Sequence, residues 1–201
     1  MNNHPRNERT LALIKPDGIQ RSLIGEIMSR YERIGLKLVA MKMIVPTKDF
    51  IEKFYNLDPE WMIKTGEKNI KAYKDKGIQH PMNDPLKVSR FILDKLKMYY
   101  TSGPVIAMIW EGAHAVAIVR KLTGITEPLM SDVGTIRGDF MLDSYKMADD
   151  DKRSIRNLVH ASGSVTEAEN EIGHWFSQNE IIKYRHVQEG ILYDVNIDGM
   201  E

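Results

Sequence analysis

The sequence lacks cysteine, so it offers no disulfide framework, no thiolate metal site and no thiol nucleophile. It also lacks an excess of charge of either sign, because 28 Lys and Arg balance 28 Asp and Glu. Without net charge there is no general attraction to nucleic acid or anionic lipid, so any phosphate must be bound by locally placed cations. No apolar run reaches the length of a membrane span, and residues 1–10 lack the apolar core of a signal peptide. We therefore expect a cytoplasmic protein that binds neither membranes nor specific nucleic acid.

The common phosphate-binding and metal-binding motifs are absent as well. The sequence contains no G-x-x-x-x-G-K-[ST] and no G-x-G-x-x-G, which excludes a P-loop and a dinucleotide fingerprint. It contains no H-E-x-x-H and no cluster of His, Asp and Glu at metal-ligand spacing. We therefore expect no residue to serve as a dedicated metal ligand.

The pattern of apolar residues predicts one mixed domain. Strands are expected at residues 10–15, 36–45, 105–110 and from 158, the first closed by a turn at Pro16-Asp17-Gly18. Helices are expected at residues 23–34, 49–55, 88–99, 113–122 and 165–176. This order predicts an α+β fold on the ferredoxin-like plan, a split βαβ unit with a four-stranded antiparallel sheet covered by helices.

Several polar segments interrupt this plan. Residues 58–87 are rich in Lys, Pro and Gly and are predicted to be a surface insertion with one or two helices, and residues 143–153 a second insertion. Residues 125–138 show neither a helical nor a strand period and are predicted to be a long functional loop. Residues 178–201 form a tail in which residues 191–193 are expected to be strand-like.

One histidine lies where chemistry is plausible. His160 follows a predicted strand and precedes a helix whose start is marked by Ser164 and Glu167, the S-x-x-E pattern of a capping box. Small neighbours leave its ring accessible, and a neutral imidazole is a competent nucleophile near pH 7. Glu171 lies on the same helix face as Ser164 and could reach back toward Ser162 to orient the ring. The alternatives are a structural histidine and a solvated glutamate.

Three cations lie at the ends of predicted elements, where a phosphate could approach. Lys15 ends the first strand, Arg120 lies on a helix and Arg137 lies in a glycine-containing loop. Phosphoryl transfer needs cations to balance the charge of the transferred group. Each cation alone is more often a surface charge, and only together do they indicate a phosphate site.

Four blocks of the sequence resemble, in order, the signature of the nucleoside diphosphate kinase family. They are Ile14-Lys15-Pro16-Asp17-Gly18, Ser102-Gly103-Pro104-Val105, Gly134-Thr135-Ile136-Arg137-Gly138-Asp139-Phe140 and Asn157-Leu158-Val159-His160-Ala161-Ser162-Gly163-Ser164. The resemblance extends over about residues 9–193 and implies that residues 1–201 form one kinase domain with the two insertions and the tail.

The resemblance implies a function and a set of residue roles. The γ-phosphate of a nucleoside triphosphate would pass to a nucleoside diphosphate by a ping-pong route through Nδ1-phosphorylated His160, with Glu171 positioning the ring through Ser162. Residues implied to bind the nucleotide are Lys15, Tyr55, Arg120, Thr126 and Arg137 at the phosphates and ring, Asn157 at the ribose, and Ile92 and Leu96 at the base. Mg²⁺ would be held mainly by the nucleotide phosphates. A homo-oligomer, a hexamer or a tetramer, is also implied.

The sequence departs from the family pattern at two places. The usual H-G-S-D-S is replaced by His160-Ala161-Ser162-Gly163-Ser164, which adds a methyl group and removes an acidic side chain. Neither change alters the nucleophile, so activity is expected to survive. The aromatic residue that usually stacks on the base is replaced by Ile92, with Phe91 adjacent. The insertion at residues 58–87 could form a lid over the nucleotide or a surface excursion without contact.

Two other functions are compatible with the predicted fold. A ferredoxin-like RNA-binding module would need a basic surface and paired exposed aromatics on central strands, but the net charge is zero and strand 105–110 has one aromatic residue. A catalytically silent, kinase-like interaction subunit would have no reason to retain Lys15, Arg120, Arg137 and His160 together. The enzyme is therefore the preferred interpretation.

Overall fold

The computed structural model describes residues 4–75, 77 and 79–196. The last part of the predicted tail, residues 197–201, and the first three residues of the chain lie outside this range.

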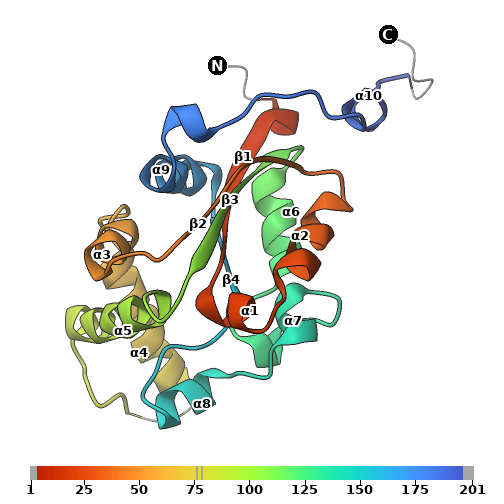
Figure 1. The fold of residues 1–201 in the computed structure, drawn as a ribbon. Helices are drawn as coiled ribbons and strands as arrows, with labels where there is room; N and C mark the ends of the chain where they lie inside the picture. Colours follow the sequence, from red (N-terminus) through yellow and green to blue (C-terminus); the bar gives the residue numbers. More distant parts are fainter. Residues whose placement is uncertain (1–3, 76, 78, 197–201) are drawn as a thin grey trace.

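A four-stranded sheet in the order β2-β3-β1-β4 lies at the centre of the molecule (Figure 1). Its strands are β1 (Glu8–Ile14), β2 (Lys37–Ile44), β3 (Val105–Gly112) and β4 (Val159–Ala161). Every neighbouring pair is antiparallel, which confirms the predicted α+β, ferredoxin-like plan. The site residues at the end of β1 are thereby brought beside β4, although some 145 positions separate the two strands in the sequence.

Helices cover both faces of the sheet. Those on one face are α3 (Lys48–Tyr55), α5 (Pro85–Tyr100) and α9 (Val165–Trp175), and those on the other are α2 (Ile24–Glu32), α6 (Ala115–Thr123) and α7 (Ile136–Phe140). Alternate residues of β1 pack into the two cores: Leu11 and Leu13 into the first, Ala12 and Ile14 into the second. This explains why the strand is apolar at successive positions, as strands covered on both faces are.

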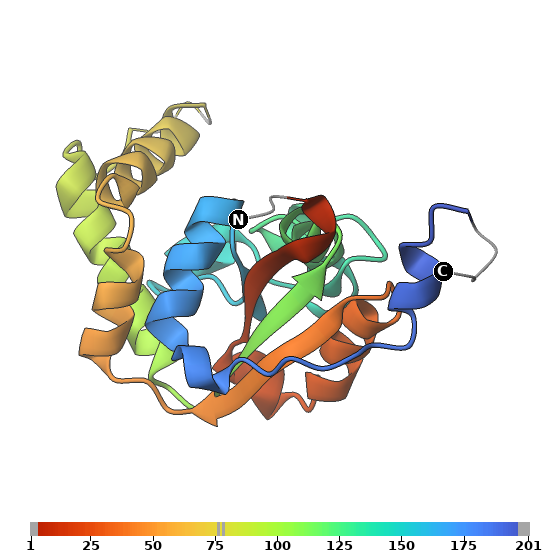
Figure 2. The same cartoon turned by 90° about the horizontal axis from the view of Figure 1, so that it is seen from above.

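A helical arm projects from this body, as Figure 2 shows. We define the arm as residues 61–84, which comprise α4 (Trp61–Asp75) and its link to α5. The two helices approach closely at Gly66, where an added Cβ would lie 2.0 Å from the carbonyl oxygen of Pro85. Among its described residues, the predicted insertion at 58–87 therefore holds the whole of α4 and the first three residues of α5, which begins three residues before the helix expected from the sequence.

Three local expectations need correction. The turn expected at Pro16 is the first turn of a short helix, α1 (Pro16–Gln20), because proline suits the first helical position. The strand-like piece expected at residues 191–193 is wrong, since Glu189–Leu192 form helix α10. The loop at residues 125–138 contains a 3-10 turn and the start of α7.

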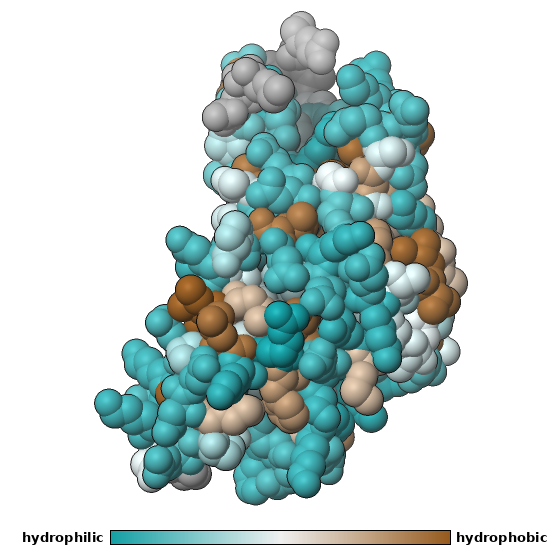
Figure 3. Space-filling view, turned by 90° about the vertical axis from the view of Figure 1, so that its left-hand side faces the viewer, coloured by the Kyte–Doolittle hydropathy of each residue, from teal (hydrophilic) through white to brown (hydrophobic). Residues whose placement is uncertain are grey.

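The remaining segments lie against the body. The second predicted insertion holds α8 (Tyr145–Asp150), and 3-10 turns occur at Pro5–Asn7, Pro128–Met130 and Gln178–Glu180. The tail runs along β2, where the Ile182 N–H donates to the Val39 carbonyl at 2.8 Å. The face drawn in Figure 3 is mostly hydrophilic, with separate hydrophobic patches. Within the described ranges, no helix has the length and hydropathy needed to span a membrane.

Candidate functional site

The proposed nucleophile lies on β4 with one ring nitrogen engaged and the other free. His160 pairs with Leu13 of β1, and its side chain is 16% exposed. Its Nε2 lies 2.8 Å from Oε1 of Glu171, and Nδ1 makes no hydrogen bond to any described residue. Because a carboxylate accepts, Nε2 carries the proton and the lone pair lies on Nδ1. The ring of Phe54 packs edge-on against the imidazole, with the centroids 5.2 Å apart.

Glu171 contacts the histidine directly. It is buried on α9, and its second oxygen, Oε2, accepts from Ser162 Oγ at 2.6 Å. Glu171 was expected to act on His160 through Ser162, but the structure places the ring on one carboxylate oxygen and the hydroxyl on the other. Ser162 thus fixes the carboxylate, and the carboxylate fixes the ring, as an orienting partner does in other catalytic pairs.

Lys15 is a buried cation between the strand ends. Its Nζ donates to Oδ1 of Asn157 at 2.7 Å and lies 5.2 and 5.3 Å from the ring centroids of Tyr99 and Tyr100. Burial and, to a smaller extent, the positive charge of Arg137 lower its pKa to about 7, while Asp17 opposes the shift. An incoming phosphate would supply a negative charge that stabilises the protonated form of this buried amine.

Arg137 is buried at the start of α7 and holds three chain segments together. Its Nε, Nη1 and Nη2 donate to the carbonyl oxygens of Asn157, Gly124 and Val159 at 3.1, 2.9 and 2.5 Å. A guanidinium has five N–H groups, so two remain for another partner. Since Val159 precedes His160, the arginine supports the strand that carries the histidine. It also places a positive charge beside that strand.

The chain makes an unusual turn between these groups. Leu158 has a positive φ of 63°, and the Val159 N–H donates to the Asn157 carbonyl at 2.7 Å, which is a strained γ-turn. The turn leaves the Asn157 side chain between Lys15 and the Thr126 carbonyl, which accepts from its Nδ2 at 2.9 Å. Asn157 therefore links the lysine to the loop after α6.

The remaining predicted residues surround this centre. Arg120 is exposed on α6 and has no polar partner in the described part of the chain. Tyr55 on α3 donates to the hydroxyl of Tyr100 at 3.3 Å, which connects it to the ring beneath Lys15. On α5, Leu96 packs against the core and Ile92 is half-buried.

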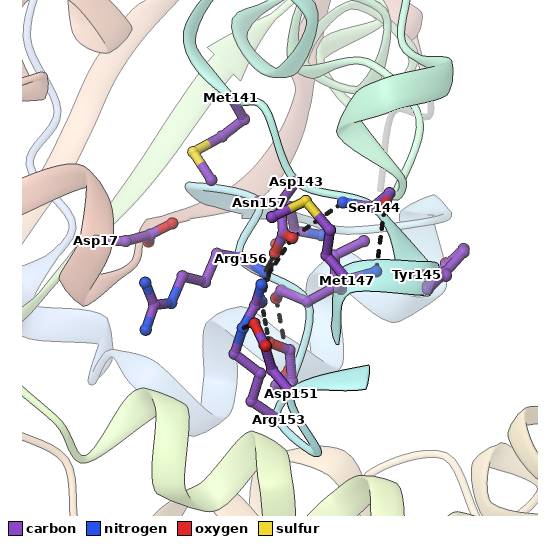
Figure 4. Close-up of polar contacts among 12 residues, drawn as sticks. Asp17, Met141, Asp143, Ser144, Tyr145, Met147, Asp151, Arg153, Arg156 and Asn157 are labelled. Atoms are coloured by element: carbon purple, nitrogen blue, oxygen red, sulfur yellow. Dashed lines mark hydrogen bonds and ion pairs between the residues drawn. The ribbon is translucent and has the colours of Figure 1, made fainter. Parts of the chain in front are cut away.

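Sequence reasoning missed several residues of the site. Tyr99 and Tyr100 form the aromatic floor under Lys15, and their signal was their place directly before the Thr101-Ser102-Gly103-Pro104 segment. Arg156, which precedes Asn157, extends its side chain away from Asp143 (Figure 4), and its guanidinium makes no hydrogen bond or ion pair with a residue that the structure describes.

Asp143 holds the two ends of the second insertion together. It is buried, and its carboxylate accepts from Nη1 and Nη2 of Arg153 at 2.6 and 2.9 Å and from the backbone N–H of Arg156 at 2.7 Å (Figure 4). These contacts lower the pKa of Asp143, against an opposing effect of burial. The insertion therefore leaves and re-enters the body at one fixed point, immediately before Asn157.

Comparison of sequences relates the chain to known enzymes. The profile described as nucleoside diphosphate kinase matches residues 8–62 and 86–181, and so omits most of the arm. A nucleoside diphosphate kinase of Pyrobaculum aerophilum is 46% identical over 180 residues, which cover 88% of this chain and 98% of the relative. One of Borreliella burgdorferi is 36% identical over 182 residues, covering 90% and 95%.

Solved structures give the same result. The crystal structure of the NDP kinase from Pyrobaculum aerophilum superposes with a TM-score of 0.83 at 44% identity, covering 88% of this chain and all of that one. The nucleoside-diphosphate kinase from Borrelia burgdorferi, a transition state mimic with bound vanadate and ADP, has a TM-score of 0.74 at 35% identity, covering 90% and 94%.

Proposed function

Because the chain belongs to the nucleoside diphosphate kinase family and has its phosphotransferase activity, we propose that His160 carries the phosphoryl group between nucleotides. The observation that supports this most is the ring geometry: Nε2 is held by Glu171, and Nδ1 is free beside a strand that Arg137 contacts. A relative with bound vanadate and ADP shares this fold. The alternative of a catalytically silent subunit gives no account of this arrangement.

The reaction would proceed in two steps at one site. The Nδ1 lone pair of His160 attacks the γ-phosphorus, and the bond from that phosphorus to its bridging oxygen breaks, so the electron pair leaves with the nucleoside diphosphate. Nε2 keeps its proton on Glu171 throughout. An acceptor diphosphate then binds where the first product left, and its terminal oxygen attacks the phosphorus of the phosphohistidine while the N–P bond breaks and returns its electron pair to Nδ1. The two nucleotides therefore use the same residues in turn.

The surrounding side chains suit a polyphosphate. Lys15, Arg120 and the two unused N–H groups of Arg137 would hold the phosphates, and Thr126 and Tyr55 would add contacts to the phosphates and the ring. Asn157 would reach the ribose. The apolar positions Ile92 and Leu96 would contact the base, without hydrogen bonds that distinguish one base from another.

Mg²⁺ fits this site as a companion of the nucleotide. The protein donors around the phosphates are cationic or amide groups, and the buried Glu171 carboxylate is occupied by His160 and Ser162. Mg²⁺ prefers oxygen ligands and keeps several waters, so the phosphates themselves would hold it and supply charge neutralisation there. The chain's own contribution is the lysine and the arginines.

A homo-oligomer, a hexamer or a tetramer, completes the proposal. Exposed apolar side chains gather in and beside the segment expected to be a long loop: Ile125, Leu129, Met130, Val133 and Leu142. Such a group suits a contact between copies of the chain. Light scattering of the whole protein measures the number of subunits.

The assignment of the nucleophile is tested by labelling. The wild-type protein incubated with γ-labelled ATP and Mg²⁺ should take up acid-labile, alkali-stable label and pass it to added GDP or dCDP. His160→Ala should do neither, with activity lowered by more than about a thousandfold. His174→Asn is the matched control, because His174 lies on α9 with Nε2 bonded to the Phe50 carbonyl. Label that persists in His160→Ala would place the nucleophile elsewhere.

A further inference from the structure

A second carboxylate lies close to the proposed nucleophile. Glu167 is the third residue of α9, and its N–H donates to Oγ of Ser164, the residue that caps the helix, at 3.1 Å. In the expected capping box the Glu167 carboxylate would accept from the Ser164 N–H, but here Oε2 accepts from the Gly163 N–H at 2.9 Å. The carboxylate is therefore turned back past the start of the helix, toward the segment that follows β4.

This position depends on glycine at residue 163. A Cβ added there would lie 2.4 Å from Oε2 of Glu167 and 3.5 Å from Nη1 of Arg120. The glutamate and the arginine thus flank one small space that a side chain at 163 would fill. Position 163 is where the family pattern has an acidic residue, and in this chain Glu167 brings a carboxylate to the same place from the helix.

The carboxylate is near the imidazole as well. A ring nitrogen of His160 and one oxygen each of Glu167 and Glu171 all lie within 4.8 Å of one another. Glu171 is already bonded to Nε2 and to Ser162, so Glu167 is additional negative charge beside the ring. The ring becomes cationic when Nδ1 bonds to phosphorus while Nε2 keeps its proton, and a nearby carboxylate stabilises that cation.

We propose that Glu167 is a positioning residue that, together with Glu171, stabilises the positive charge the His160 ring acquires on phosphorylation. This inference rests on the proposed role of His160. In the step concerned, the N–P bond forms at Nδ1, the bond from phosphorus to the bridging oxygen breaks, and the diphosphate leaves with the electron pair. Glu167 neither gives nor takes a proton.

The neighbouring charges set how strongly Glu167 acts. The titratable and charged groups that face it are His160 from β4, Glu171 from its own helix α9, Arg120 from α6 and the Tyr55 hydroxyl from α3. Desolvation and Glu171 raise the pKa of Glu167, and His160 and Arg120 oppose that rise. Arg120 also lies on the far side of the space above Gly163, where it offsets the repulsion between Glu167 and a phosphate.

Glu167→Gln separates the electrostatic role from a structural one. Gln can still accept from the Gly163 N–H, so the melting temperature should stay within about 2 °C of wild type. The single-turnover rate of His160 phosphorylation by Mg-ATP should fall about threefold to tenfold at its plateau. Because loss of a carboxylate destabilises the imidazolium, the acid limb of the pH–rate profile should move to lower pH by about half a unit. Rates are measured from pH 5 to 9.

Two further variants complete the test. Glu169→Gln removes the same charge from an exposed position on α9 and should leave rate and profile unchanged. Gly163→Ala displaces the Glu167 carboxylate without changing the charge of the chain, and should shift the profile in the same direction as Glu167→Gln. A Glu167→Gln profile that overlays the wild type would overturn the inference. Its failure is distinguishable from that of the proposed function, since only the latter leaves His160→Ala able to take up label.

Discussion

Three charged side chains of the proposed catalytic centre are buried, whereas the charged side chains described in the arm are exposed. At the centre, Lys15, Arg137 and Glu171 are buried, and each is hydrogen-bonded to a fixed partner. In the arm, Lys64 is paired with Glu60 at 2.7 Å, but both side chains are more than 60% exposed. The family profile matches the first region and omits most of the second.

Burial thus distinguishes charged residues that are arranged to bind a substrate from charged residues that only keep the surface hydrophilic. Exposed helical ion pairs contribute roughly 0.3–0.5 kcal/mol each and are weakened by salt. A buried cation with a lowered pKa is stable only because the surrounding fold holds it, and it gains a partner when an anion arrives. Changes at the centre should therefore have large effects on activity, and changes in the arm small ones.

After His160→Ala, the largest effect is expected for Arg137→Ala. The change removes three hydrogen bonds to carbonyl oxygens, two of them buried and one partly buried, which should lower the free energy of unfolding by on the order of 3 kcal/mol. It also removes the cation that we propose both nucleotides use, so phosphorylation by ATP and discharge to GDP should each slow about 10²- to 10³-fold. Denaturant unfolding and single-turnover rates measure the two effects.

Arg33→Ala serves as the control for this variant, because Arg33 is exposed and its side chain makes no hydrogen bond or ion pair with a described residue. It should change neither stability nor rate. Unequal slowing of the two half-reactions in Arg137→Ala would mean that the arginine serves one nucleotide only.

A smaller effect, on pH dependence, is expected for Lys15→Arg. The pKa of Lys15 is lowered to about 7, so above that pH the free enzyme loses the cation, and binding of ADP must then take up a proton. The dissociation constant should rise up to about tenfold per pH unit between pH 7 and 9 in the wild type. Arginine stays charged, so the slope should flatten in Lys15→Arg. Calorimetry in buffers of different ionisation enthalpy measures the proton uptake.

The same shift affects stability with a definite sign. Because the folded-state pKa is below the unfolded value, the unfolded chain binds more protons between about pH 7 and 10.5, and stability without nucleotide should rise with pH across that window. Lys42→Arg is the control, since Lys42 lies on β2, away from the site, and pairs with Glu180 of the tail. A wild-type dissociation constant independent of pH would contradict the assignment of Lys15 to the phosphates.

Much of the site could be predicted from the sequence because it lies in short local patterns. The apolar run that ends at Lys15 and the small residues around His160 each mark a strand end, and antiparallel pairing of β1 with β4 then brings the two together. The helix start at Ser164 was equally local. Such patterns depend only on neighbours in the chain, so they can be recognised without knowledge of the fold.

What could not be predicted depends on contacts between distant segments. The aromatic floor of Tyr99 and Tyr100 under Lys15 requires α5 to pack against the end of β1, and nothing at either place signals the other. The Glu167 carboxylate bonds Gly163 in place of the helix cap because a glycine leaves the space open. Residues 191–193 have a strand-like composition, but Glu189–Leu192 form a helix near α2, where Leu192 packs against Gly35.

The smallest effect is expected for loss of the arm. A chain lacking residues 63–85, with Met62 joined to Leu86 by two glycines, keeps every proposed site residue and should retain KM values for ATP and GDP within about threefold. The arm contacts the second insertion through Tyr73, whose hydroxyl donates to Asp149 at 3.0 Å. Tyr73→Phe removes only this hydrogen bond and should lower the free energy of unfolding by about 0.5–1.5 kcal/mol or less. If the shortened chain stays folded but KM rises tenfold or more for both nucleotides, the arm reaches the nucleotide, and the division between a buried catalytic centre and a solvated excursion is wrong.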